Sequence, residues 1–514
     1  MAPEPAEAHA VREAAPAPAP QKLSRRAAGV LLHASSLPGP HGVGDLGPAA
    51  YRFVDFLKDA GQHWWQMLPV VPPGPGDSPY SSPSAFAGNP LFISLEALVQ
   101  DGFLADEDLA QAPEFSARKT DYDAAEGFKE ELLRKAFARF SEKGRPEQWD
   151  DFRAFCVETS DWLDDYGLFC ALKKAHGGKA WSRWEEPLRH RRFRFWSRET
   201  VRQAGEESAY RQFVQYLFRR QWEALRNYAA ARGVGFIGDV PLYVAYDSAE
   251  VWSRPEIFRL DADLRPEAVA GVPPDYFSRD GQLWGNPLYR WDKLAEDGYS
   301  WWTRRLLRAS RLFDAVRLDH FIGFARYWAV PAGAKTARGG EWTPGPGHDF
   351  FAAVRKQLPE LQIIAEDLGL VGPDVSELRD AFRFPGIKVL QFSMGDGRVE
   401  DPPQGYPAAS LACTGTHDND TLLGWLSKRK DKSFLMKAFG ADPAAPQWGF
   451  IKAVYESPAQ TAVVPLQDAL GLGSSARMNF PGEPKGNWRW RLDETALTPE
   501  LAKTLADLAR GTGR

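Results

Sequence analysis

The chain of 514 residues carries 63 Lys and Arg against 68 Asp and Glu, a formal net charge of −5. This balance argues against the broad positive field that binding to nucleic acid or to an anionic membrane requires. Three cysteines, Cys156, Cys170 and Cys413, cannot form a complete disulfide framework, so we expect a cytoplasmic protein. The length suits either one decorated barrel or about three domains, and no run of about 18 apolar residues is present to span a bilayer.

The first 22 residues differ in composition from the rest. They contain eight Ala and five Pro, with no aromatic residue and no Leu or Ile. Such a segment cannot bury enough surface to offset the entropy lost on ordering, so residues 1–22 are predicted to be a disordered tail. Glu4, Glu7 and Glu13, together with the missing apolar segment, argue against a transit or signal peptide.

From Ala28 onward, short apolar runs end in polar residues and are each followed by a helical pattern. Near-continuous apolar strands that alternate with helices predict a parallel sheet covered on both faces. Eight runs favour a closed (β/α)₈ barrel, the TIM barrel of the α/β class, with large helical insertions. The runs are residues 29–33, 64–68, 235–240, 315–318, 363–365, 387–392, 411–415 and 461–466.

Two long gaps between these runs predict insertions into a catalytic barrel of residues 23–514. Residues of about 95–230 are too many for one crossover helix and are predicted to form a helical insertion. Residues of about 241–310 are predicted to form a loop and helix insertion. Within the first gap, two apolar stripes have helical spacing: Phe128, Leu132, Leu133, Ala136, Phe137 and Phe140, then Tyr210, Phe213, Val214, Leu217, Phe218, Trp222 and Leu225.

The segment 42–47 reads Gly-Val-Gly-Asp-Leu-Gly and matches the dinucleotide fingerprint G-x-G-x-x-G. The preceding run ends at His33, too early for a tight strand-to-helix turn, and no acid stands about 20 residues beyond Gly47 to hold a ribose. The context of the segment therefore argues against a nucleotide site. The nine histidines show no metal-ligand spacing, so no metal site is predicted either.

Acidic side chains recur where the predicted strands end. Arg317 and Asp319 are two residues apart and therefore lie on the same side of a strand. A guanidinium beside a carboxylate keeps it ionised, as a nucleophile at neutral pH requires. Glu366 ends the next run, so two carboxylates are expected to meet at one barrel mouth, where like charge raises the proton affinity of one of them. Glycosidic chemistry uses this arrangement.

Two further acids, Asp418 and Asp239, follow other predicted strands. For any single acid, a helix cap or a turn is an alternative explanation. Four together favour catalysis, because catalytic groups of a barrel come from the carboxyl ends of several strands.

Aromatic side chains also lie in polar loops rich in Gly and Pro, at residues 77–83 and 282–287. Flat rings beside hydroxyl and amide groups suit sugar rings, whose C–H faces alternate with hydroxyl groups. Anchoring of the loops explains each such aromatic residue equally well.

Taken as a set, the motifs resemble the amylomaltase family (4-α-glucanotransferases or disproportionating enzymes) of the α-amylase superfamily. The resemblance covers residues of about 24–495. It rests on residues 29–33, 36–38, 64–69, 80–83, 89–91, 238–241, 271–277, 284–289, 317–321, 365–369, 416–420 and 486–491.

The resemblance implies transfer of α-1,4-glucan segments between malto-oligosaccharides by a retaining double displacement, without cofactor or metal. It also implies that the barrel has no separate C-terminal β-domain. It further implies Asp319 as nucleophile, Glu366 as acid and base, and Asp418 as the carboxylate that stabilises the transition state. The positions implied to contact the substrate or support the site are Arg317, Asp239, His417, Tyr80, Asp275 and Trp284.

Three alternatives remain open. An α-amylase-like hydrolase uses the same residues. A non-catalytic glucan-binding protein, in contrast, has no reason to keep together the four charged residues Arg317, Asp319, Glu366 and Asp418. A nucleotide-dependent oxidoreductase needs the 42–47 segment to bind phosphate. The oligomeric state and the preferred chain length of the glucan stay undetermined.

Overall fold

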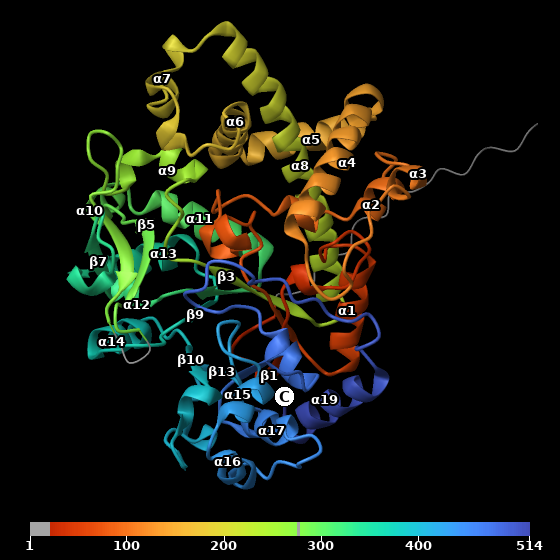
Figure 1. Cartoon of the computed structure of the whole chain (residues 1–514), viewed down its shortest axis with the longest axis vertical. Coiled ribbons are helices and arrows are strands. Elements are labelled where there is room, and N and C mark those ends of the chain that lie inside the picture. The colour runs from red at the N-terminus through yellow and green to blue at the C-terminus, as the bar shows by residue number, and fades with distance from the viewer. Residues whose placement is uncertain (1–20, 275–277) are drawn as a thin grey trace, which may run out of the picture.

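A computed structural model describes residues 21–274 and 278–514, whose centre is an eight-stranded parallel sheet. The strand order is β10-β13-β14-β1-β2-β3-β6-β9, so the sheet curls into a barrel (Figure 1). These strands are β1 (Ala27–Leu31), β2 (Trp64–Gln66), β3 (Gly235–Val240), β6 (Ala315–Leu318), β9 (Ile363–Ala365), β10 (Gly386–Val389), β13 (Ser410–Cys413) and β14 (Thr461–Pro465). Each coincides with one of the eight predicted runs, and the barrel prediction is confirmed.

The two outer strands of this order, β9 and β10, are joined without a β-ladder in the described part of the chain. The main-chain N–H of Ala365 donates to the carbonyl of Pro385 over 2.9 Å. The N–H of Ile387 donates to Oδ1 of Asp367 over 2.8 Å, so a side chain replaces a missing ladder bond. The barrel is therefore nearly closed.

Helices surround the barrel and bury its apolar outer face. The long helix α8 (Arg198–Ala230) packs on β3 and on α1 (Pro48–Asp59), which in turn contacts α19 (Pro499–Gly511). The remaining helices that follow β3 in the chain are α9 (Ala249–Ser253), α10 (Trp291–Glu296), α11 (Ser300–Leu312), α12 (Ile322–Ala325), α13 (Gly347–Gln357), α14 (Pro373–Ala381), α15 (Leu422–Lys428), α16 (Lys432–Ala438), α17 (Gln447–Glu456) and α18 (Leu466–Ala469). No helix in the described ranges is long and apolar enough to cross a membrane.

Between β2 and β3 the chain forms a group of helices at one end of the molecule, coloured orange to yellow in Figure 1. The two predicted apolar stripes lie on α4 and α8, and their rings meet in the core, where Phe140 stacks on Phe213 at 4.7 Å. The helices before α8 are α2 (Leu95–Gln100), α3 (Asp106–Leu109), α4 (Tyr122–Lys143), α5 (Pro146–Glu158), α6 (Ser160–Ala175) and α7 (Glu186–Arg189).

A second, antiparallel sheet lies beside the barrel, with the order β5-β4-β7-β8. Its strands are β4 (Ala268–Val272), β5 (Gln282–Pro287), β7 (Arg326–Pro331) and β8 (Glu341–Pro344), and a short ribbon elsewhere is formed by β11 (Met394–Gly395) and β12 (Arg398–Val399). The predicted loop and helix insertion at about 241–310 was therefore incomplete, because it also contains β4 and β5. Most residues of β5 are exposed, and the strand consequently lacks the apolar pattern on which the prediction depended.

The glycine-rich segment 42–47 has a packing role. A Cβ atom on Gly44 would lie 2.1 Å from the carbonyl oxygen of Ala34, and Gly42 has a positive φ of 78°. Both positions therefore require glycine for the close passage of the chain. The predicted tail lies outside the described residues except for Gln21 and Lys22, and Lys22 pairs with Glu360 at 3.2 Å.

Candidate active site

Parallel register brings three of the predicted charged residues together at the carboxyl ends of β3 and β6. Asp239 is paired with Arg317 in that register, and Nη1 of Arg317 lies 2.6 Å from Oδ2 of Asp239. The same Nη1 lies 2.9 Å from Oδ1 of Asp319. Tyr80 donates its hydroxyl to Oδ2 of Asp239 over 2.8 Å. One buried guanidinium thus joins two carboxylates, and it places a positive charge beside Asp319.

Burial and charge act against each other in this group. Burial lowers the pKa of Arg317, but Asp239 and Asp319 outweigh it and raise that pKa well above its ordinary value. Burial raises the pKa of Asp239 to about 7, against the opposing effects of Arg317 and the Tyr80 hydroxyl. Burial also raises the pKa of Tyr80 well above its usual range, so its hydroxyl keeps the proton that it donates.

Glu366 follows β9, next to β6 in the barrel, and the register pairs Leu318 with Ala365. Burial raises the pKa of Glu366 well above its ordinary value, Arg317 opposes the rise and Asp319 adds to it. The raised pKa favours the protonated form of this carboxyl group, which is the form that a general acid requires.

His320 fixes the orientation of this carboxyl group through its main chain. Its N–H donates to Oε2 of Glu366 over 2.7 Å. Because Oε2 accepts this bond, Oε1 is the oxygen left to carry a proton. His320 has a φ of 53°, a left-handed conformation uncommon for a residue other than glycine. Burial lowers the pKa of its imidazole to about 4, so the ring is neutral.

Asp418 lies in the loop 416–420 that follows β13, and its side chain is 46% exposed. Nε2 of His417 is 3.3 Å from Oδ1 of Asp418. The ring of Tyr80 stacks on His417 at 5.2 Å, and Trp488 lies beside both rings. Burial lowers the pKa of His417, which makes this imidazole a neutral member of an aromatic wall.

The electrostatic contacts show that these acids share one mouth. The charge of Asp319 acts on the pKa values of Glu366 and His417, and the charges of Asp319 and Asp418 both act on that of Tyr80. The structure therefore brings together the residues that the sequence placed at several strand ends.

Trp284 reaches this mouth from β5 of the second sheet. Its ring meets the ring of His320 edge to face at 4.8 Å and is 39% exposed. Asp275, the remaining predicted contact residue, lies outside the described residues.

Sequence reasoning missed three contributors to the site. The first is the main chain of His320, and the other two are Arg477 and Asn479, which contact Asp418. Asn479 stands 61 residues from Asp418, and no short-range spacing signals such a contact.

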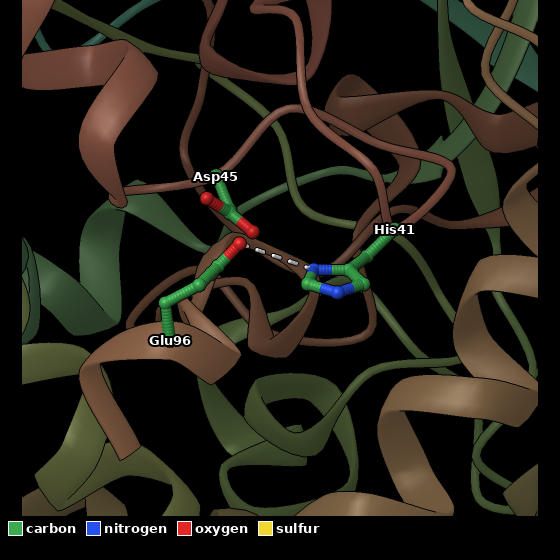
Figure 2. Close-up of side chains that lie close together, drawn as sticks. All are labelled: His41, Asp45 and Glu96. Atoms are coloured by element: carbon green, nitrogen blue, oxygen red, sulfur yellow. Dashed lines mark ion pairs between the residues drawn. The ribbon is translucent and has the colours of Figure 1, made fainter. Parts of the chain in front are cut away.

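A separate cluster of possible metal ligands is formed by His41, Asp45 and Glu96, whose ligand atoms lie within 4.8 Å of one another (Figure 2). The buried ammonium group of Lys129 lies beside them, 2.8 Å from Oδ2 of Asp45. It also donates to the carbonyls of Leu91 and Ile93, so all three of its donors are used. Because this ammonium already supplies the positive charge, we assign no metal ion to the cluster.

The mouth therefore combines a carboxylate paired with arginine, a buried carboxyl group with a raised pKa and a third, more exposed carboxylate. Glycosyl transfer needs a nucleophile and an acid on opposite sides of the bond that is cleaved. The partly exposed ring of Trp284 offers a flat face to a sugar ring, and Tyr80 and Trp488 support the wall of the mouth behind His417. The site fits a carbohydrate substrate.

Comparison with known proteins agrees with this assessment. A model of the family described as 4-alpha-glucanotransferase matches residues 32–497. The 4-alpha-glucanotransferase of Thermus thermophilus is 48% identical over 502 residues, covering 95% of this chain and 99% of the relative. The enzyme of the same name from Synechocystis sp. is 44% identical over 503 residues, covering 96% and 99%.

Among solved structures, the amylomaltase from Streptococcus agalactiae in complex with acarbose superposes with a TM-score of 0.90. It is 35% identical, and the match covers 95% of this chain and 100% of that one. The protein therefore belongs to the 4-alpha-glucanotransferase family.

Proposed function

We propose that the protein is a 4-α-glucanotransferase that moves α-1,4-glucan segments between malto-oligosaccharides through a covalent intermediate. Membership of the family supports the activity. The observation that carries the mechanism is the contrast between two neighbouring acids: burial raises the pKa of Glu366 well above its ordinary value, whereas Asp319 lies 2.9 Å from the guanidinium of Arg317.

In the first half of the reaction, Glu366 transfers its proton from Oε1 to the glycosidic oxygen. The carboxylate of Asp319 attacks the anomeric carbon, the bond to the leaving sugar breaks, and a glycosyl ester forms. Arg317 stays bound to Asp239 throughout, which keeps a counter-charge beside the nucleophile. The leaving segment departs with the proton of Glu366.

In the second half, Glu366 is a carboxylate and acts as base. It removes the proton from the 4-hydroxyl of an acceptor sugar, whose oxygen attacks the anomeric carbon and displaces Asp319. The proton returns to Glu366, and the configuration of the anomeric carbon is retained after two inversions.

The other residues of the mouth bind the sugar. Asp418 accepts hydrogen bonds from hydroxyl groups of the reacting ring and holds this ring in a distorted shape. His417 supports Asp418. Tyr80, Asp239 and Trp284 hold or contact the glucan from neighbouring elements. Asp275, which lies between β4 and β5 in the sequence, is proposed to contact the glucan as well.

Transfer competes with hydrolysis at the covalent intermediate, because water is abundant. An acceptor wins when the site orients its hydroxyl beside Glu366, an effect that supplies up to ~7–11 kcal/mol when fully realised. The aromatic walls of the mouth favour such binding and limit the entry of water.

The test is incubation with maltotriose, with products resolved by chain length and reducing ends counted. We expect glucose together with a ladder of longer chains, while the number of reducing ends stays nearly constant. Reducing ends that rise in step with substrate loss, without longer chains, would show an α-amylase-like hydrolase. Binding of glucan without turnover would show a non-catalytic binding protein. The Asp319→Asn variant is the matched control for contaminating activity.

A further inference from the structure

Asp418 is held differently from the other acids of the mouth. Within the described residues, its carboxylate is contacted at Oδ1 alone, by one hydrogen bond and one longer polar contact. Nδ2 of Asn479 donates to it over 2.6 Å, and Nε2 of His417 lies at 3.3 Å. Oδ2 is thereby left for a ligand. A half-exposed aspartate on a loop would otherwise exchange between rotamers, since no burial restrains it.

Arg477 fixes the distance between Asp418 and Asn479. Its Nη2 donates to the carbonyl oxygen of Asp418 over 2.5 Å, and its Nε donates to the carbonyl oxygen of Asn479 over 2.7 Å. One planar guanidinium thus joins the main chains of both residues. Such a rigid fork sets geometry more tightly than separate single bonds.

The segment that carries Asn479 is itself anchored at both ends. The N–H of Trp488 donates to the carbonyl of Met478 over 2.7 Å, and Oδ1 of Asn487 accepts the N–H of Phe480 over 3.0 Å. The hydroxyl of Tyr122 donates to the carbonyl of Trp488 over 2.9 Å. Because the loop 478–488 is closed on itself, Asn479 has a defined position from which to hold Asp418.

We propose that Asn479, fixed by Arg477, is a positioning residue that holds Asp418 through Oδ1 and turns Oδ2 toward the reacting sugar. This inference rests on the function proposed above for Asp418. The amide of asparagine suits the task because it donates a hydrogen bond and carries no charge that would neutralise the carboxylate. Loss of this bond leaves the chemistry of Asp418 intact but lets its carboxylate rotate away from the sugar.

The first experiment measures fluoride release from α-maltotriosyl fluoride with glucose as acceptor, for Asn479→Ala and for the similarly sized Asn479→Leu. We expect kcat to fall by about 10- to 100-fold, as expected for a misplaced catalytic group. KM should change by less than about threefold, because the aromatic walls that bind the sugar remain. The melting temperature should stay close to that of the wild type, and Asn227→Ala, at an exposed position of α8, is the matched control.

The second experiment asks whether Asn479 acts through Asp418. In a double-mutant cycle, Asn479→Ala should change kcat by less than about twofold once Asp418→Ala is present, because nothing remains to be positioned. The Asn479→Asp variant places a second carboxylate against Asp418, so one proton must be shared. Its activity should move to lower pH than that of the wild type, although Arg477 and His417 lie next to the pair.

The outcomes separate this inference from the proposed function. Wild-type kcat in Asn479→Ala, together with an inactive Asp418→Ala, would overturn the positioning role alone. Additive losses in the double variant, or an unshifted pH profile in Asn479→Asp, would also overturn it. Wild-type kcat in Asp418→Ala would instead overturn the function assigned to Asp418.

Discussion

The acids of the mouth are held in two contrasting ways. Asp319 and Glu366 stand at the ends of β6 and β9, and the strands themselves set their separation. Arg317, which lies beside Asp319, is 6% exposed and has a register partner in Asp239. Asp418 is 46% exposed, lies on a loop, and depends on side chains from a segment about 60 residues away.

The difference separates two tasks. Groups that form or break a covalent bond need fixed charge states. Burial at a strand end raises the pKa of Glu366, and the neighbouring guanidinium of Arg317 supplies a counter-charge to Asp319. A group that grips the hydroxyl groups of a changing ring needs access to solvent and a fixed direction. Hydrogen bonds from neighbouring loops supply that direction at little cost in desolvation.

The largest effects are expected from Asp319→Asn and Glu366→Gln, which remove the nucleophile and the acid. Turnover of maltotriose should fall by about 10³- to 10⁶-fold in each, and Asp418→Asn should lie at the lower end of this range. Azide should partly restore only Asp319→Ala, because it replaces a missing nucleophile. Unchanged circular dichroism serves as the control for folding, and near-normal turnover in any variant would contradict the role of that residue.

Two arginines allow the two regions to be compared for stability. Arg317→Met leaves Asp239 buried without its counter-charge and should lower the free energy of unfolding by about 3–5 kcal/mol. Arg477→Met loses hydrogen bonds to two carbonyls at a half-buried position and should lower it by about 1–2 kcal/mol. Urea denaturation at pH 8, where Asp239 of the wild type is charged, measures both. Equal losses would show that the loop region is as strongly coupled to the core as the strand ends.

The raised pKa of Glu366 gives a pH dependence with a defined sign. The acid must be protonated in the first half-reaction, so kcat/KM for maltotriose should fall as pH rises through this pKa. With α-maltotriosyl fluoride, whose leaving group needs no proton, the fall should be absent. A fall of equal size with both donors would assign it to another group.

The same shift affects stability. The folded protein keeps the proton of Glu366 above the pH at which the unfolded chain releases it. The free energy of unfolding should therefore decline as pH rises from the ordinary glutamate pKa to the raised one. Urea denaturation over this pH interval should show a shallower decline for Glu366→Gln, which has no proton to lose. An identical slope in both proteins would contradict the shift.

The smallest effect is expected from Trp284→Ala, which removes one wall of the mouth. The contact of the Trp284 ring with a sugar should contribute about as much as a contact between two aromatic side chains, about 0.5–1.5 kcal/mol. Its loss should therefore lower kcat/KM by roughly threefold to tenfold. Trp342→Ala is the matched control, because Trp342 is also 39% exposed but lies on β8 against Trp328. Equal losses in the two variants would remove Trp284 from the glucan contacts.

The two regions also differ in how far the sequence predicts them. Buried strands are near-continuous apolar runs, so all eight barrel strands were predicted, and so was the shared face of Arg317 and Asp319. The second sheet was missed because β5 is largely exposed and its pairing with β4 contains a register shift. The partners of Asp418 could not be predicted, since the contact of Asn479 depends on how two distant loops pack.

The join between β9 and β10 has a mechanical consequence for the acid. Gly386 has no room for a side chain, because a Cβ atom there would lie 2.5 Å from Oδ2 of Asp367. Asp367, held by Arg379, therefore links the two strands through its hydrogen bond to β10, and it lies immediately after Glu366 in the chain. Two strands joined by one main-chain and one side-chain hydrogen bond separate more easily than two strands joined by a full β-ladder. Amide hydrogen exchange should be faster along this seam than between β3 and β6, and the proposed proton donor Glu366 directly precedes the residue that joins the two strands.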